Sequence, residues 1–78
     1  MVIEVRLYAT LRRYSPASAT GIVMVDVPDG ITVDELLAEM EIDRHEVKMI
    51  MVNGMHSDGN RVLADGDRVG LFPPVGGG

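Results

Sequence analysis

One helix start is marked more clearly than any other feature of the chain, and it limits the folds open to this sequence. Pro28-Asp29-Gly30 is a turn signal, and Thr32 follows as an N-cap with Glu35 three residues later, the spacing of a capping box. Ile31 and Leu36 stand at the positions of a hydrophobic staple. The apolar residues that follow recur at helical spacing and predict one amphipathic helix: Val33, Leu36, Leu37 and Met40.

Two segments before this helix have the period-two pattern of β-strands. Ile3, Val5 and Leu7 share one face of residues 2–8, and the residues between them are charged or aromatic. Valines occupy every second position of residues 22–27 from Val23 onward. Both segments therefore predict half-buried strands.

Three further strands are predicted after the helix. A short helical turn is expected at residues 44–47, followed by an apolar strand at residues 49–52. Asn53-Gly54 is the strongest two-residue hairpin signal, and it returns the chain through residues 55–56. A last strand is predicted at residues 68–72. Strand, strand, helix and three strands indicate an α+β domain, with one sheet of four to five strands wrapped around one main helix.

Composition excludes several classes of protein. A length of 78 residues allows one small domain, and the absence of cysteine removes disulfides, thiolate metal sites and cysteine nucleophiles. A formal net charge of −5 argues against a general nucleic-acid binder, since phosphate binding relies on clustered cations. Glu4 and Arg6 interrupt the first apolar stretch, and no later run approaches membrane-spanning length. We expect a cytoplasmic protein that binds neither nucleic acid nor membrane.

The chain offers few groups for catalysis or metal binding. His45 and His56 are its only histidines, and neither has a second histidine at ligand spacing. Asp58-Gly59-Asn60 fails the spacing of a calcium loop, and no Lys-Ser or Lys-Thr follows Gly59 as a phosphate loop requires. We predict no metal site and no nucleotide site in this chain. Three methionines lie within helix or strand patterns and are interpreted as core residues: Met40, Met49 and Met51.

The C-terminal segment has no evident role in folding. The chain ends in Leu71-Phe72-Pro73-Pro74-Val75-Gly76-Gly77-Gly78. Two prolines cannot continue a ladder of backbone hydrogen bonds, and glycines carry no side chain to bury. Proline-rich backbone prefers an extended conformation of about 3.1 Å per residue, so residues 73–78 reach on the order of 20 Å. We expect a domain at residues 1–72 and an extended tail at residues 73–78 that is suited to entering another protein's active site.

Several stretches resemble, in their order along the chain, the ubiquitin-like sulfur carriers of the MoaD/ThiS family. This family includes the small subunit of molybdopterin synthase and the carrier of thiamine biosynthesis. The resemblance implies the β-grasp fold, a mixed sheet around one helix. The stretches that carry it are Ala9-Thr10-Leu11-Arg12, Val27-Pro28-Asp29-Gly30, Val52-Asn53-Gly54, residues 63–69 and the tail.

The resemblance also implies a reaction at the carboxylate of Gly78. In the family, an E1-like adenylyltransferase uses ATP and magnesium to convert this carboxylate into an acyl-adenylate. Sulfur from a sulfur donor then displaces AMP and leaves a thiocarboxylate. Gly76 and Gly77 permit close approach of the backbone in a narrow channel, and Pro73 and Pro74 lower the entropy lost on threading. The chain itself is expected to bind no cofactor.

The Phe72-Pro73-Pro74 stretch favours the molybdopterin branch of the family. There the tail enters the large subunit of the synthase, which is MoaE-like, and the chain is a carrier subunit and not an enzyme alone. Phe72 is either an apolar anchor at this interface or a core residue of the last strand. Gly76 departs from the better-known members, in which this position is often alanine or another small residue. The residues expected to contact a partner are Phe72, Pro73, Pro74, Val75, Gly76 and Gly77.

Three functions remain open on the sequence alone. The chain is a sulfur carrier for molybdopterin, thiamine or another thiolation pathway, a ubiquitin-like modifier conjugated through Gly78, or an interaction module whose tail never reacts. The first two require a free carboxylate at Gly78, and the third does not.

Overall fold

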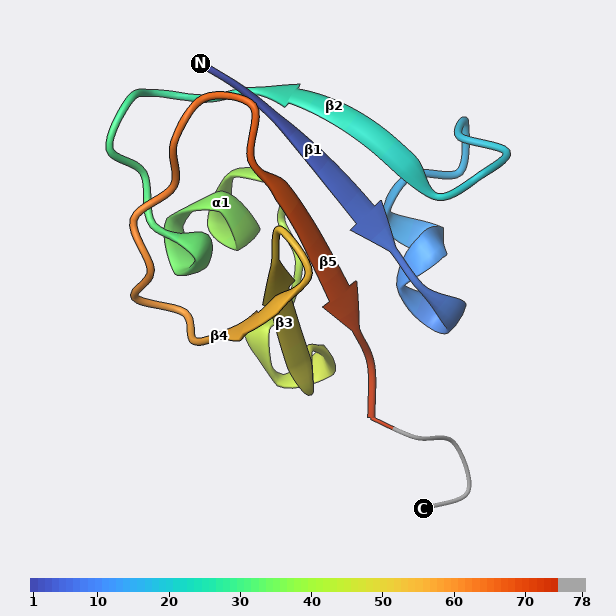
Figure 1. Cartoon of the computed structure of the whole chain (residues 1–78). Coiled ribbons are helices and arrows are strands. Elements are labelled where there is room, and N and C mark those ends of the chain that lie inside the picture. The colour runs from blue at the N-terminus through green and yellow to red at the C-terminus, as the bar shows by residue number, and fades with distance from the viewer. Residues whose placement is uncertain (75–78) are drawn as a thin grey trace.

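A computed structural model describes residues 1–74 of the chain (Figure 1). Five strands form one sheet, and one α-helix lies against one of its faces. The elements are β1 (Val2–Leu7), the 3₁₀-helix η1 (Ala9–Tyr14), β2 (Ile22–Asp26), α1 (Val33–Glu39), the 3₁₀-helix η2 (Arg44–Glu46), β3 (Met49–Val52), β4 (Met55–Ser57) and β5 (Arg68–Phe72). The expected α+β class and β-grasp arrangement are confirmed.

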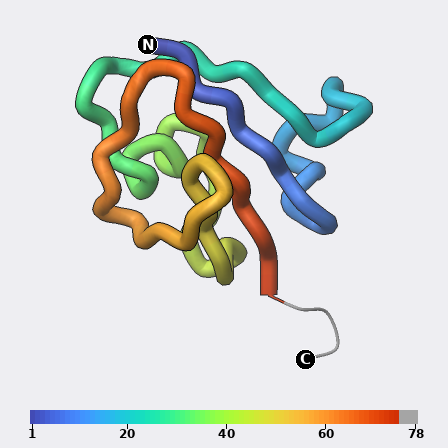
Figure 2. The backbone as a smooth tube through the Cα atoms, in the orientation of Figure 1, coloured from blue at the N-terminus to red at the C-terminus, as the bar shows by residue number. Residues whose placement is uncertain are grey.

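The last strand lies in the middle of the sheet. The strand order is β2-β1-β5-β3-β4; β1 and β5 run parallel, and the other neighbouring pairs are antiparallel. The first and the last strand of the chain thus lie side by side inside the sheet. In Figure 2 the red strand β5 runs past the middle of the molecule to the end opposite the N-terminus. The tail therefore leaves from the centre of the sheet.

The predicted capping box starts α1. The Glu35 N–H donates to Oγ1 of Thr32 at 3.2 Å, and the Thr32 N–H donates to the Glu35 carboxylate at 2.9 Å. The buried face of α1 and the inward faces of the strands then share a single aliphatic core. Its buried members are Ile3, Val5, Leu7, Leu11, Val27, Ile31, Val33, Leu36, Leu37, Ile42, Val47, Ile50, Val52, Leu63, Val69 and Leu71.

The hairpin between β3 and β4 is also as predicted. Asn53 has a φ of 52° and Gly54 a φ of 82°, the two positive values that a type I′ turn requires. The second short helix begins near its predicted place as η2, with the Asp43 side chain accepting the His45 N–H at 2.9 Å.

Two features differ from the sequence expectation. The 3₁₀-helix η1 was not predicted, and it buries Leu11 against the core. Met40 packs on the core as predicted, but the prediction is wrong for Met49 and Met51. Side chains alternate along a strand. Because Ile50 and Val52 point inward from β3, both methionines lie on the opposite face of the sheet.

Candidate functional site

The sheet face opposite α1, the open face, carries the base of the tail. Phe72 ends β5, where its carbonyl accepts the Lys48 N–H at 2.7 Å. Its ring is half-buried and stacks on Tyr8, the residue that follows the neighbouring strand β1, with 4.2 Å between ring centroids and 7° between planes. Leu71, one residue earlier, is fully buried in the core. Phe72 is therefore an open-face residue, and its interpretation as a core residue is wrong.

A hollow of about 210 Å³ lies beside these two rings. The register of the sheet places Gly70 directly between Arg6 on β1 and Met51 on β3. Because a glycine stands where its neighbours carry side chains, the centre of the open face is left unfilled. The residues that line the hollow are Arg6, Tyr8, Met51, Gly54, Arg68, Gly70 and Phe72.

Among residues 1–74, both charged residues that line the hollow are arginines. Arg6 donates to the Glu4 carboxylate at 2.7 Å, and this bond raises the pKa of the Arg6 guanidinium above its ordinary value. The Arg68 side chain forms no ion pair with any group in residues 1–74. The hollow thus combines apolar and aromatic walls with two guanidinium groups.

The predicted site residues divide between the described part of the chain and the part beyond it. Phe72 and Pro73 are half-buried, and Pro74 is exposed at the end of the described segment. Val75, Gly76, Gly77 and Gly78 lie outside the described residues. The predicted reaction at Gly78 therefore remains a prediction, as does the role of the tail in partner binding.

Sequence reasoning missed the residues of the hollow other than Phe72. A usable signal existed, since the alternation that buries Ile3, Val5 and Leu7 directs Arg6 and Tyr8 to the other face. Gly70 inside a predicted strand is a second signal, because a glycine there often marks a close approach by another molecule. The strand order places the residues that give these two signals next to each other.

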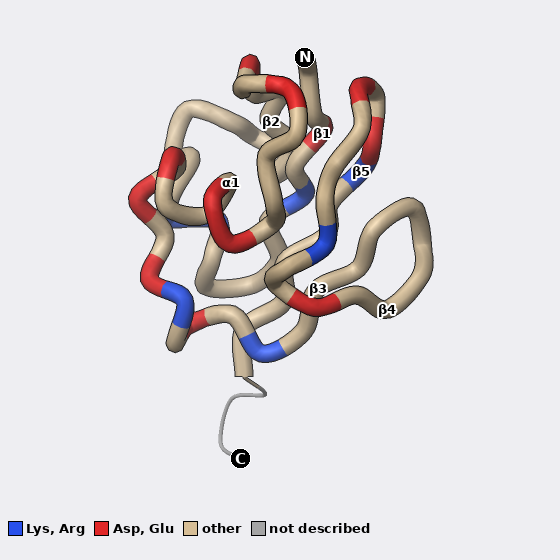
Figure 3. The backbone as a smooth tube through the Cα atoms, turned by 90° about the vertical axis from the view of Figure 1, so that its left-hand side faces the viewer, with Lys and Arg blue, Asp and Glu red and all other residues tan. Residues whose placement is uncertain are grey.

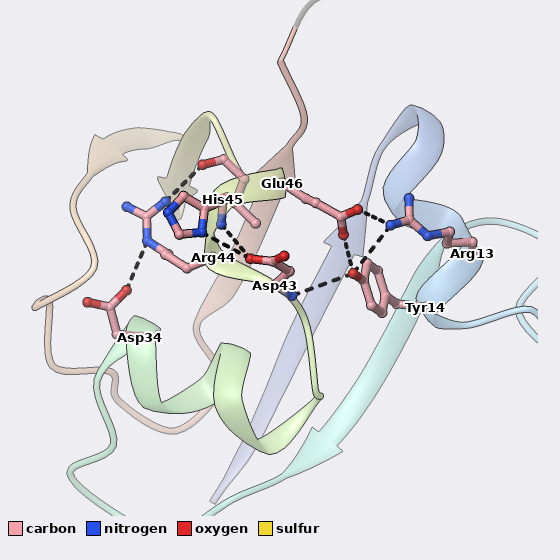
Figure 4. Close-up of polar contacts among 8 residues, drawn as sticks. Arg13, Tyr14, Asp34, Asp43, Arg44, His45 and Glu46 are labelled. Atoms are coloured by element: carbon pink, nitrogen blue, oxygen red, sulfur yellow. Dashed lines mark hydrogen bonds and ion pairs between the residues drawn. The ribbon is translucent and has the colours of Figure 1, made fainter.

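Apart from the hollow, a cluster of polar side chains connects η1 to η2 (Figure 4). The Glu46 carboxylate accepts hydrogen bonds from the Tyr14 hydroxyl and the Arg13 guanidinium, and these bonds lower the pKa of Glu46. The Arg13 guanidinium also lies 4.8 Å from the centre of the Tyr14 ring. Every charged member of this cluster already has a partner, so the cluster offers no free reactive group.

The remaining charged groups are dispersed along the backbone (Figure 3). His45 is 97% exposed, and its only ionic neighbour within residues 1–74 is Asp43 at 3.3 Å. His56 is exposed on β4. Within the described residues, no three His, Cys, Asp or Glu side chains lie close enough to hold a metal ion. Over the same residues, no helix has both the length and the hydrophobicity needed to cross a membrane.

Comparisons with known proteins agree with this geometry. The model of the ThiS family matches residues 5–78. A search of curated proteins found no significant match. Among solved structures, the putative molybdopterin converting factor subunit 1 of Pyrococcus furiosus is 26% identical with a TM-score of 0.74, over 96% of this chain and 99% of that one.

Two further structures extend the similarity to a complex and to a modifier. The first is the complex of subunits 1 and 2 of the molybdopterin-converting factor of Helicobacter pylori, with 27% identity, a TM-score of 0.63 and full coverage of both chains. The second is SAMP1 of Haloferax volcanii, with 26% identity, a TM-score of 0.70 and full coverage of both chains. The family model covers nearly the whole chain, and the chain therefore belongs to the ThiS family of ubiquitin-like sulfur carriers.

Proposed function

We propose that this chain carries sulfur as a thiocarboxylate on Gly78 and delivers it in molybdopterin biosynthesis. The proposal rests on one observation. The match to the family model extends through Gly78, and the tail that ends at Gly78 starts from the central strand β5. Because Phe72 ends the central strand, the sheet fixes the point at which the tail begins. Phe72 and Tyr8 hold its base by ring stacking.

The chemistry follows from the properties of a carboxylate. At neutral pH its negative charge repels nucleophiles, and oxide is a poor leaving group. An activating enzyme that supplies ATP and magnesium overcomes both obstacles: a Gly78 oxygen attacks the α-phosphorus, pyrophosphate leaves, and an acyl-adenylate forms. Sulfide then attacks the acyl carbon and expels AMP. If a persulfide attacks instead, a thiol must reduce the resulting acyl disulfide to give the thiocarboxylate.

In this proposal, a partner protein, the large subunit of the synthase, holds the sulfur acceptor in its active site. Subunit 1 of the Helicobacter pylori factor resembles this chain over its full length and is found in complex with subunit 2. By analogy, the present chain acts as the carrier subunit, and the partner supplies the active site. The glycines at residues 76–78 carry no Cβ, so a narrow channel can admit them.

Mass spectrometry of the intact protein tests the carrier function. Coexpression with the E1-like enzyme of the same genome, followed by supply of ATP and a sulfur source, is expected to add the mass difference of one oxygen replaced by sulfur. The control is a variant that lacks Gly78, which is expected to stay unmodified. Formation of the adenylate without any gain of sulfur by the wild-type chain would contradict the proposal.

A second assay tests the pathway. The thiocarboxylated chain is mixed with the cognate large subunit and the cyclic pterin precursor, and formation of molybdopterin is measured. We expect product only with the thiocarboxylate form. Transfer of sulfur to a thiazole precursor, with none to the pterin, would assign the chain to the thiamine branch instead.

Protein modification is the second candidate function, and the similarity to SAMP1, a small archaeal modifier protein, favours it. In that case a lysine amine of a target attacks the Gly78 adenylate, AMP leaves, and an isopeptide bond forms. The expected observation is a ladder of conjugates in cell lysate that disappears when Gly78 is deleted. If no such ladder is found and the thiocarboxylate forms, the carrier function would be supported and protein modification would be excluded.

A further inference from the structure

We propose that β2 pairs with β2 of a second copy of this chain and so joins two five-stranded sheets into one. The two strands run antiparallel about a two-fold axis beside Met24. The inference concerns one edge of the sheet and is independent of the proposed function.

The strand β2 lies at an edge of the sheet without the usual protection against pairing. Within residues 1–74, the strand order places β2 at one edge and β4 at the other (Figure 1). A length of only three residues protects β4. In contrast, β2 has five residues, pairs with β1 without a bulge and contains neither lysine nor proline. Four of the five residues are apolar, and Ile22 and Met24 are 41% and 61% exposed. Such an edge is a template for another strand.

The outer backbone groups of β2 are directed toward a position that a second strand can take. In an antiparallel pair, hydrogen-bonded residues alternate along each strand. The Leu7 N–H donates to the Gly21 carbonyl at 2.8 Å, just before the start of β2. From there the register assigns the odd-numbered residues of β2 to the hydrogen bonds with β1. The N–H and C=O of Met24, at the centre of the strand, therefore point away from β1.

The backbone of β2 is complementary to itself in one register. When Met24 lies opposite Met24 of the second copy, these two residues exchange two backbone hydrogen bonds. Ile22 then lies opposite Asp26 of the second copy, and the Asp26 N–H donates to the Ile22 carbonyl. That carbonyl already accepts the Ser18 hydroxyl at 2.9 Å, and its second lone pair takes the additional bond.

The side chains on both faces favour a second copy as the partner. Val23 and Val25 are half-buried against the core, and in this register each covers the other across the axis. On the open face, Arg6 lies beside Ile22 on the inner side, and Asp26 of the second copy lies on its outer side. Two strand spacings, about 10 Å, separate the backbones of these unlike charges, a gap that their side chains can span. The two-fold axis makes this charge complementarity occur twice.

The interface is small and leaves the tail free. Stable interfaces bury about 1,200–2,000 Å², and one pair of five-residue strands buries less. We therefore expect a weak, reversible dimer with a Kd on the order of 0.1 mM. Because β1 separates β5 from the β2 edge, pairing leaves the base of the tail uncovered in both copies.

Sedimentation equilibrium of the whole chain, over concentrations from about 10 µM to about 1 mM, measures the association. We compare M24K with M55K, because Met55 is a 69% exposed methionine on β4 at the opposite edge. Both substitutions change the net charge equally. M24K is expected to raise Kd at least about tenfold, since two ammonium groups then meet at the axis, and M55K less than about twofold.

Two further measurements test the backbone pairing itself. M24P removes the outward N–H and is expected to abolish the dimer, while backbone NMR spectra report whether the variant is folded. In a mixture of labelled and unlabelled wild-type chain, isotope-filtered NMR is expected to show contacts between the Hα atoms of Val23 and Val25 in different copies. These two residues form the non-hydrogen-bonded pair, in which strands approach most closely.

Three results would overturn the inference. The first is a wild-type chain that stays monomeric at about 1 mM, which would leave the β2 edge to a strand of another protein. The second is an equal rise of Kd in M24K and M55K. The third is a dimer whose contacts between copies lie on β3 or β4, and this result holds even if M24P fails to fold.

Discussion

At the scale of single residues, Gly21 is held in a position that no other residue fits. Its φ is +80°, and an added Cβ would lie 2.5 Å from the Leu7 carbonyl oxygen. The Gly21 carbonyl in turn accepts the Leu7 N–H at 2.8 Å. We expect G21A to lower the free energy of unfolding by about 2 kcal/mol or more, since it adds a steric clash to the cost of a positive φ.

Gly30 provides the matched control for this substitution. It has a φ of +82°, but no atom lies within 4 Å of an added Cβ. G30A should therefore cost only the backbone term, about 1 kcal/mol. Urea unfolding at neutral pH measures both variants. Equal losses would show that the contact with Leu7 contributes nothing.

Phe72 and Leu71 are consecutive residues with opposite surroundings. Leu71 is completely buried, whereas Phe72 lies half-buried on the open face with its ring on Tyr8. L71A is expected to cost about 3 kcal/mol as a core cavity, and F72A less than about 2 kcal/mol, mostly lost stacking. Urea unfolding of the two variants checks the order. A larger loss for F72A would mean that its ring carries more of the fold than its burial indicates.

At the scale of elements, a carboxylate joins the β3–β4 hairpin to the start of β5. Asp67 accepts the Ala64 N–H at 2.8 Å and the Asn53 side-chain amide at 2.9 Å. Asn53 also accepts the Arg68 N–H at 2.9 Å through its side-chain oxygen. The bond from Ala64 is the main reason, and the bond from Asn53 the second, that the pKa of Asp67 is lowered from its ordinary value.

The direction of this shift gives a stability that depends on pH. A carboxylate whose pKa is lower in the folded chain adds stability above the unfolded pKa, about 3.9, and loses it as the pH falls through the folded pKa. We expect D67N to be less stable than the wild type at pH 7. The difference should disappear as the pH falls below about 4. Urea unfolding across this range measures it; a difference that does not depend on pH would exclude the ionised Asp67 as its source.

At the scale of the whole molecule, the core and the tail are separate in the chain. Every fully or nearly fully buried apolar residue of the described structure lies between Ile3 and Leu71. We therefore expect deletion of residues 73–78 to change the free energy of unfolding by less than about 1 kcal/mol while abolishing adenylation. Thermal unfolding and pyrophosphate exchange measure the two effects. A truncated chain that unfolds much more easily would mean that the tail belongs to the domain.

Much of the fold was predictable because its signals are local. The capping box of Thr32, the Asn53-Gly54 turn and the alternation in β1 each act over a few residues. Such signals persist in any tertiary context that accepts the element. The η1 helix was missed because residues 9–14 contain neither a capping signal nor a clear period; the burial of Leu11 against the core accompanies it.

The site was predictable in part. Local sequence is enough to specify the strand that leads into the tail and the chemistry of the tail's residues, because both follow from local backbone preferences and from residue type. The pairing of the strands, in contrast, sets which partners surround Phe72 on the open face and places Arg6, Gly70 and Met51 in one row across three strands. Residues far apart in the chain meet there through the parallel pairing of β1 with β5, which depends on burial of the whole core and not on any short segment.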